Sequence, residues 1–256
     1  LGVYDLYTRL TEEFPDILFE SCASGGARFD PGMLYFAPQT WTSDDTDAGE
    51  RMKIQYGTSF VYPLVSMGCH VSAVPNHQLQ RMTPLETRGN VACFGAFGYE
   101  LDLNLLSGRE MEVVKRQIAF VKKYRELIQI EGDFYRLRSP FEGNDTAWLV
   151  VSRDRTQAVA GFYQRLNKTN ASWLRLQLQG LEEDMLYEVS CDVTPVSIYD
   201  EERARFDGNR QEKQRVKKYT ANGAELMYAG IPVDRRDLDR KGGDFASLIY
   251  TITKCI

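Results

Sequence analysis

Residues 40–60 read TWTSDDTDAGERMKIQYGTSF, a stretch that combines a brief strand, a polar tip and the start of a helix. The tip holds three carboxylates within four positions. Asp47 and Glu50 have the spacing of a capping pair, which predicts that Asp47 is the N-cap of the helix. The helix dipole offsets only part of the remaining charge of Asp44 and Asp45. At least one of these two carboxyls is therefore expected to be partly protonated or directed at a ligand.

The same order of strand, polar tip and helix is predicted four times within residues 1–131. The first strand is assigned to the buried apolar run at residues 17–19, and the last helix to residues 108–130, where apolar side chains keep helical spacing. Short apolar strands that alternate with helices favour a parallel sheet. Four such units make half of a (β/α)8 barrel, or TIM barrel. The polar tips SCASGG, TSDDTD, SAVPNH and ELDLN then lie at its C-terminal face, where barrel enzymes carry their chemistry.

Residues 132–256 have a different hydrophobic pattern, in which short alternating strands are separated by turn signals. This pattern predicts an antiparallel β-sandwich or sheet domain. The strands are expected at residues 146–153, 157–166, 172–181, 185–191, 224–233 and 246–253. The mixed-charge segment at residues 200–218 is expected to be a solvated excursion between strands. The predicted fold class is thus α/β plus all-β: the C-terminal half of a TIM barrel in residues 1–131, followed by the β domain in residues 132–256.

Charge and cysteine content narrow the class of protein. The 31 basic and 36 acidic residues nearly balance, which disfavours nucleic acid and anionic membrane surfaces as partners. The five cysteines are scattered and show no C-x-x-C spacing, which argues against a disulfide framework or a zinc site and favours reduced thiols in a cytoplasm. The sequence has neither a signal-peptide pattern nor an apolar run of membrane length. Because it enters a helical pattern without an initiator methionine, we expect a piece of a longer cytoplasmic protein.

The acidic tip has several possible chemical uses. A calcium loop would need the D-x-[DN]-x-[DN]-G register and a distant bidentate Glu, which residues 44–50 lack. A cysteine nucleophile would pair Cys22 with His70 or His77, but Cys22 is expected in a loop without a helix terminus to activate its thiol. Both histidines are expected to be hydrogen-bonded supports of a strand tip. The use that remains is carboxylate chemistry without a metal or cofactor. Its main example is glycoside cleavage, in which one carboxylic acid donates a proton to the leaving oxygen and a second carboxylate meets the anomeric carbon.

Several long motifs resemble a known family. ESCASGGARFDPGMLY at residues 20–35, WTSDDTD at residues 41–47 and ERMKIQYGTS at residues 50–59 are similar to glycoside hydrolase family 36, the bacterial α-galactosidases. HVSA at residues 70–73, PNHQ at residues 75–78 and FGYEL at residues 97–101 extend the similarity. The resemblance covers about residues 1–130. The remainder is similar to the family's C-terminal domain only by its position in the chain and its pattern of short alternating strands. Within the first motif, Arg28 and Asp30 are expected to form an ion pair that holds the loop.

The resemblance implies a retaining hydrolase that releases terminal α-linked galactose from melibiose- and raffinose-type oligosaccharides. Asp44 matches the general acid/base, which protonates the glycosidic oxygen and later deprotonates water. Cys22 and Gly25 match positions that line the sugar near its 2-hydroxyl. Trp41 is expected to form an apolar wall, and Asp45 is assigned to substrate binding as well.

One feature of the family is absent from the sequence. The family's nucleophilic aspartate lies in an Asp-Tyr-x-Lys-x-Asp type of motif, which does not occur in the 256 residues. We therefore expect a fragment that carries the acid without its nucleophile and is inactive alone, and a homo-oligomer when the protein is full length. An α-N-acetylgalactosaminidase, a galactosyl-transferring relative and a non-catalytic glycan-binding module are the alternative functions.

Overall fold

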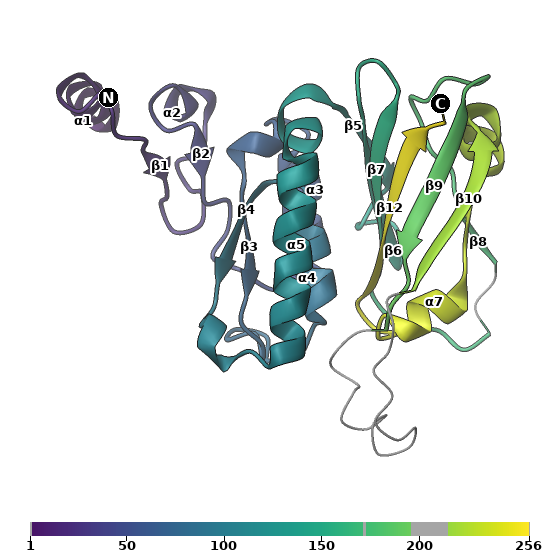
Figure 1. Cartoon of the computed structure of the whole chain (residues 1–256). Helices are drawn as coiled ribbons and strands as arrows, with labels where there is room; N and C mark the ends of the chain where they lie inside the picture. The colour runs from purple at the N-terminus through teal and green to yellow at the C-terminus, as the bar shows by residue number, and fades with distance from the viewer. Residues whose placement is uncertain (1, 171–172, 196–214, 256) are drawn as a thin grey trace.

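The computed structural model describes residues 2–170, 173–195 and 215–255. Parallel strands, a layer of helices and an antiparallel sheet follow one another across the molecule (Figure 1). The α-helices of the described residues are α1 Gly2–Glu13, α2 Pro31–Phe36, α3 Ala48–Thr58, α4 Leu85–Ala92, α5 Gly108–Glu126 and α7 Arg235–Arg240. Helices α3, α4 and α5 separate the parallel strands from the sheet (Figure 1).

The first part of the chain forms short parallel strands. They are β1 Glu20–Ser21, β2 Gln39–Thr40, β3 Gly68–Ser72 and β4 Ala96–Glu100. β1 pairs with β2 and β3 pairs with β4, while a parallel bridge between Thr40 and Met67 links the two pairs. Helices α2, α3, α4 and α5 follow these strands in turn. The predicted alternation of strand, tip and helix is confirmed, and sequential strands lie side by side.

Helix α3 begins where the sequence predicts. Asp47 Oδ1 accepts a hydrogen bond from Glu50 N at 3.1 Å, so Asp47 is the N-cap. In a complete capping box, the Glu50 carboxylate would accept a hydrogen bond from Asp47 N. Here Asp47 N donates instead to the carboxylate of Asp45, at 3.0 Å. The cap therefore fixes both the helix start and the loop in front of it.

The rest of the chain forms a six-stranded antiparallel sheet in the order β10-β9-β12-β7-β6-β5. Its strands are β5 Asp133–Arg138, β6 Asp145–Val151, β7 Gln157–Gln164, β9 Leu186–Asp192, β10 Val216–Asn222 and β12 Ala246–Lys254. Two shorter strands, β8 Leu174–Leu176 and β11 Ile231–Val233, pair with each other in antiparallel fashion. The predicted antiparallel sheet is confirmed.

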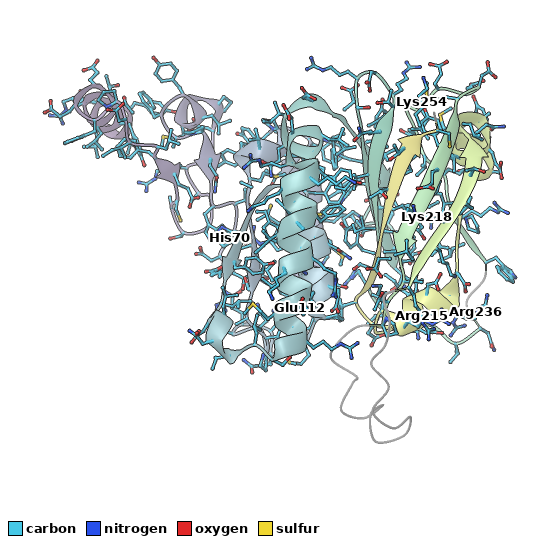
Figure 2. All side chains as sticks on the ribbon, in the orientation of Figure 1. His70, Glu112, Arg215, Lys218, Arg236 and Lys254 are labelled. Atoms are coloured by element: carbon cyan, nitrogen blue, oxygen red, sulfur yellow. The ribbon has the colours of Figure 1, made fainter. Side chains whose placement is uncertain are left out.

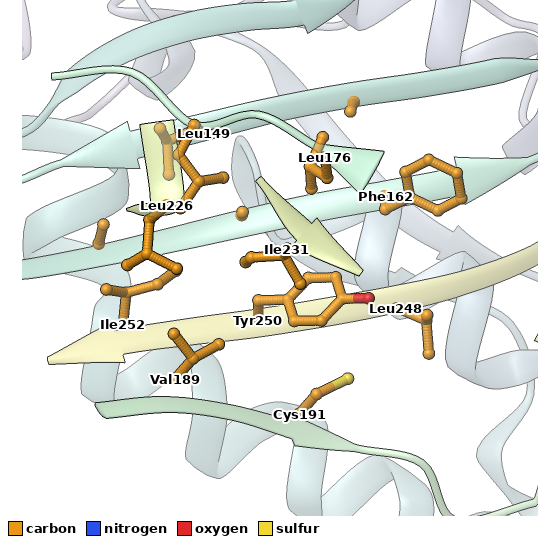
Figure 3. Packing of buried hydrophobic residues seen from close by; sticks show 14 of the residues in the cluster. Leu149, Phe162, Leu176, Val189, Cys191, Leu226, Ile231, Leu248, Tyr250 and Ile252 are labelled. Atoms are coloured by element: carbon orange, nitrogen blue, oxygen red, sulfur yellow. The ribbon is translucent and has the colours of Figure 1, made fainter. Parts of the chain in front are cut away.

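Both faces of this sheet are buried. On one face, Trp148 and Tyr163 belong to the same apolar core as residues of α3, α4 and α5. On the other face, Leu149 and Phe162 pack with residues of β8 and β11 (Figure 3). Strands buried on two faces read as nearly continuous apolar runs, which is the pattern of β6 and β7. The sheet thus shares its core with the helices that support the parallel strands.

The strand predicted at residues 17–19 is wrong. Strand β1 begins only at Glu20, and the Ile17 and Leu18 side chains are 52% and 88% exposed. An apolar run is buried only where another segment covers it, and no described segment covers Leu18. The apolar character of the run therefore indicates a contact surface rather than a strand.

Three predictions in the second part also need correction. The strand predicted at residues 224–233 is a π-helix at Glu225–Ala229 followed by β11, and the strand predicted at residues 172–181 shortens to β8. The excursion predicted at residues 200–218 is wrong at its end, because residues 216–218 begin β10. Residues 200–214 lie outside the described residues. β10 is an edge strand that exposes most of its side chains, so it lacks the apolar alternation that marks a strand in sequence.

Candidate active site

The polar tips of the first two units lie at one edge of the parallel strands. Cys22 follows β1 directly, Trp41 follows β2 directly, and the two strands run parallel. Their carboxyl ends therefore meet at the edge where parallel βα sheets bind ligands. All five predicted site residues fall in these two neighbouring loops.

The three carboxylates of the tip have different surroundings. Asp47 is 2% exposed, and its Oδ1 caps α3 and forms an ion pair with Arg81. Asp45 is half-buried and accepts a hydrogen bond from Asp47 N, as described above. Asp44 is exposed, and its carboxylate makes no hydrogen bond or ion pair with any other described residue. Asp44 is thus the carboxyl of the tip that is open to a ligand, while a ligand contact for Asp45 stays a prediction.

Gly25 brings the loop after β1 against this tip. Its φ angle is +70°, a conformation that L side chains rarely adopt. A Cβ atom at this position would lie 2.5 Å from Asp44 N and 2.8 Å from Ser43 Cα. Only a residue without a side chain allows so close an approach, so Gly25 sets the distance between the two loops.

Arg28 closes the same loop, although not through the predicted ion pair. Its Nη2 donates to Cys22 O at 3.1 Å, while the Cys22 side chain is exposed. Asp30 instead caps α2 by accepting from Met33 N at 2.9 Å, and it accepts a second hydrogen bond from Tyr4 Oη at 2.8 Å. The ion-pair prediction is wrong because a helix start and a tyrosine occupy the Asp30 carboxylate.

Trp41 forms one side of the edge. Its ring centroid lies 4.6 Å from that of His70, and the guanidinium carbon of Arg51 lies 4.2 Å from the Trp41 ring centroid. Gly68 gives the indole room, because a Cβ there would lie 3.0 Å from Trp41 Cε3. The Trp41 ring therefore contacts both His70 and Arg51. Its role as a wall for a sugar stays a prediction.

His70 lies on β3, on the side of the helices away from the antiparallel sheet (Figure 2). Its Nδ1 is 3.9 Å from Glu100 Oε2. Burial lowers the pKa of His70, and the Glu100 carboxylate opposes that shift. The surroundings of His70 therefore disfavour its protonated form.

The loop after β3 is supported by Asn76 rather than by a histidine. Asn76 is 2% exposed, accepts from Gln78 N at 3.0 Å and donates to Thr46 Oγ1 at 3.1 Å. His77 is exposed. The hydrogen-bonded support predicted for the histidines is therefore wrong at His77, because an amide can both accept and donate within the loop.

Sequence reasoning missed Arg51, a deeply buried charged group at this edge. Its side chain is 2% exposed, and it reaches from α3 to both the acidic tip and β3. The available signal was its place on the buried face of α3, beside Met52 and one turn before Gln55. A basic residue on the buried face of a helix indicates a buried cation whose donors are matched by hydrogen-bond acceptors.

Other kinds of site are not found at this edge. Within the part of the chain that the structure describes, no group of three or more His, Cys, Asp or Glu side chains could hold a metal ion. A cavity of about 400 Å³ lies between α4, α5 and the sheet, with Phe97, Phe120 and Ile249 in its lining, and includes none of the predicted site residues. None of the described helices is long and apolar enough to cross a membrane.

An open carboxyl and a glycine-fitted loop thus lie at the carboxyl ends of parallel strands, the edge where parallel βα proteins commonly bind ligands. Residues 1–131 match the protein family Melibiase. Residues 145–252 match the glycosyl hydrolase family 36 C-terminal domain. The chain therefore belongs to glycoside hydrolase family 36.

Relatives in this family carry alpha-galactosidase names. Alpha-galactosidase AgaA of Geobacillus stearothermophilus is 46% identical over 252 residues, which are 98% of this chain and 30% of AgaA. The bifunctional alpha-galactosidase/sucrose kinase AgaSK of Mediterraneibacter gnavus is 43% identical over 91% of this chain and 22% of its own length. A crystal structure of an AgaA variant in complex with raffinose matches 99% of this chain and 31% of its own chain, with a TM-score of 0.84 and 45% identity. This chain thus spans less than a third of the length of these relatives.

Proposed function

We propose that the complete protein containing this chain is a retaining α-galactosidase that releases terminal α-linked galactose from melibiose- and raffinose-type oligosaccharides. The names of the relatives support this substrate class, and one relative is crystallised with raffinose. The observation that carries the proposal is the open carboxyl of Asp44 at the ends of the parallel strands. Acid-catalysed glycoside cleavage needs such a carboxyl within reach of the leaving oxygen.

In the proposed mechanism Asp44 acts twice. Its carboxyl first donates a proton to the glycosidic oxygen while a nucleophilic carboxylate bonds to the anomeric carbon and the leaving group departs. The Asp44 carboxylate then takes a proton from the water that hydrolyses the covalent intermediate. The nucleophile is proposed to lie outside these 256 residues, because the family motif that carries it does not occur in them. A retaining reaction places that carboxylate about 5–5.5 Å from Asp44.

The galactose is proposed to contact Cys22, Gly25, Trp41 and Asp45. The contact of Gly25 with the Asp44 backbone supports this group, because it places the loop of Cys22 beside the acid. Trp41, which follows β2 directly, is proposed to supply an apolar contact for the sugar ring. No cofactor takes part in the proposed reaction, since proton transfer and carboxylate attack suffice.

Residues 1–131 are proposed to be the last four βα units of a TIM barrel, and residues 132–256 the C-terminal β domain. The parallel order of the strands supports the first assignment. Large apolar side chains that are 82–88% exposed support it too, because the other half of a barrel would cover them: Leu18, Tyr35 and Leu105. Alone, the chain is expected to be inactive and prone to aggregate. The complete protein is proposed to be a cytoplasmic homo-oligomer.

The function is tested by assaying the complete protein on melibiose, raffinose and the matching α-N-acetylgalactosaminide. We expect hydrolysis of the galactosides, with α-galactose as the first product in proton NMR spectra. First-formed β-galactose would contradict retention, and faster cleavage of the N-acetylated substrate would favour the α-N-acetylgalactosaminidase alternative. Residues 1–256 alone serve as the matched sample, in which no turnover is expected. The absence of turnover in the complete protein would refute the proposal.

A further inference from the structure

Arg51 is a buried cation at the base of the acidic tip. Its Nη1 donates to Thr42 Oγ1 at 2.9 Å, and its Nη2 donates to Ser43 O at 2.7 Å. Both acceptors lie immediately before Asp44 in the chain. The guanidinium therefore fixes the backbone from which the Asp44 side chain projects.

The same guanidinium connects the tip to the next strand. Nη1 lies 3.4 Å from Gly68 O at the start of β3, and the group stacks on the Trp41 ring at 4.2 Å. One planar group thus touches the tip, the wall residue and β3. An arginine can make these contacts together because its donors form a rigid fork, whereas a lysine offers a single point charge.

The far side of the tip is fixed by different residues. Asp47 is held by its cap to Glu50 N and by Arg81, and Thr46 accepts from Asn76. Asp44 therefore lies between two anchored points although its own side chain is exposed. The anchor on its N-terminal side is Arg51.

The charge of Arg51 also acts on this edge. Burial lowers the pKa of the guanidinium, and the carboxylates of Asp45, Glu100 and Asp44 are among the groups that oppose the shift. An arginine stays protonated at neutral pH in such surroundings. A permanent positive charge thus lies behind Asp44 and Asp45.

We propose that Arg51 is a positioning residue that aims the Asp44 carboxyl at the glycosidic oxygen by holding Thr42 and Ser43 against β3. The inference rests on the proposed function of Asp44. A carboxyl that must deliver a proton depends on its position, and a displacement of about 1 Å can lower a rate about 100-fold. Because the contacts of Arg51 lie behind the tip, its loss is expected to impair proton donation more than sugar binding.

The test compares two substrates in the complete protein. Melibiose needs a proton on its leaving oxygen, whereas 2,4-dinitrophenyl α-galactoside has a leaving group that departs without one. The variants are Arg51→Met and Arg51→Lys. The matched control is Arg88→Met, because Arg88 is also buried on a helix, at 5% exposed, but donates to Ser72 O and Thr83 O rather than to residues of the tip.

We expect Arg51→Met to lower kcat/KM for melibiose at least about tenfold more than kcat/KM for the dinitrophenyl substrate. Arg51→Lys is expected to show a smaller difference, because it restores the charge without the fork. Arg88→Met is expected to affect both substrates alike. Equal losses on both substrates in the Arg51 variants would overturn the positioning role.

A milder variant covers the case in which the Arg51 variants fail to fold. Thr42→Val keeps the shape of the side chain but removes the acceptor for Arg51 Nη1. It is expected to slow melibiose selectively by a few-fold, and an unselective effect overturns the inference. Asp44→Asn separates the two proposals: unchanged melibiose turnover refutes the acid/base role itself. A selective loss in Asp44→Asn combined with unselective Arg51 variants overturns the positioning role alone.

Discussion

The antiparallel sheet and the parallel strands differ in what holds them. Strands β6 and β7 are buried along nearly their whole length, and Trp148 is 1% exposed between the sheet and the helices. Strands β1 and β2 are two residues long, and the residues that follow them include the exposed Cys22 and Asp44. The sheet is therefore stabilised by apolar burial. The edge of the parallel strands is held by a few directed polar contacts and close glycine approaches.

Substitutions in these two regions are therefore expected to have different effects. Substitutions in the sheet are expected to change the free energy of unfolding and leave the chemistry of folded molecules unchanged. Substitutions at the edge are expected to change the chemistry with smaller effects on stability.

Trp148→Ala should give the largest effect on stability. Removing a buried tryptophan leaves a cavity in the core shared by sheet and helices, which costs about 3–5 kcal/mol. Urea unfolding of the complete protein, followed by circular dichroism, measures the loss. Trp173→Ala is the control, because Trp173 is 93% exposed and its loss should change stability by less than about 0.5 kcal/mol. Equal effects of the two substitutions would contradict the proposed importance of the shared core.

Gly25→Ala should combine a moderate stability loss with a large kinetic one. An alanine at φ +70° is strained by about 1–3 kcal/mol, and its Cβ would displace Asp44 N. The displacement is expected to lower kcat/KM for melibiose by about 100-fold. Gly57→Ala on α3 is the control, because a Cβ there meets nothing within 4 Å. Unchanged melibiose kinetics in Gly25→Ala would show that the approach of the two loops does not set the position of Asp44.

Asp47→Ala should remove the cap of α3 and lower stability by about 0.5–2 kcal/mol. It also leaves Arg81 without one of its carboxylate partners. Ser107→Ala removes the equivalent cap of α5, a hydrogen bond between Ser107 and Glu110 that is exposed and distant in sequence from the tip. Thermal unfolding compares the two losses. Only Asp47→Ala should also slow melibiose hydrolysis, and the same kinetic effect from Ser107→Ala would argue against a local role for the cap.

His70 should give the smallest effect, seen as a pH dependence. Burial lowers the folded-state pKa of His70, while the unfolded-state value is about 6.5. The unfolded state therefore binds the proton more readily, and stability falls as the pH drops below about 6.5. His70→Asn should lose less stability than the unaltered protein between pH 7.5 and pH 5.5 in urea unfolding. Identical losses would show that the surroundings of His70 do not resist its protonation.

The local signals near Asp44 were sufficient to predict the start of helix α3. The capping pair of Asp47 and Glu50 located the start of α3 and left both Asp44 and Asp45 without an assigned structural role. In the structure Asp45 accepts from Asp47 N, and the Asp44 side chain has no hydrogen-bond or ion-pair partner among the described residues. Capping depends on neighbours in sequence, and for that reason a single sequence reveals it.

Features that depend on distant segments could not be predicted in the same way. The run at residues 17–19 reads as buried, yet Leu18 is 88% exposed because burial depends on a covering segment. The acceptors of Arg51 come from the loop after β2 and from the start of β3, so its role follows only from the folded chain. Asp30 likewise found partners on two helices instead of Arg28.

The most direct measurement is the pair of kcat/KM values for melibiose and 2,4-dinitrophenyl α-galactoside in Asp44→Asn, prepared in the complete protein. A residue that supplies the proton accounts for about 10²- to 10⁴-fold in rate. We predict a melibiose loss in this range, with a much smaller loss on the dinitrophenyl substrate and an unchanged unfolding temperature. Unchanged melibiose turnover, or equal losses on the two substrates, would contradict the assignment of Asp44 as the acid.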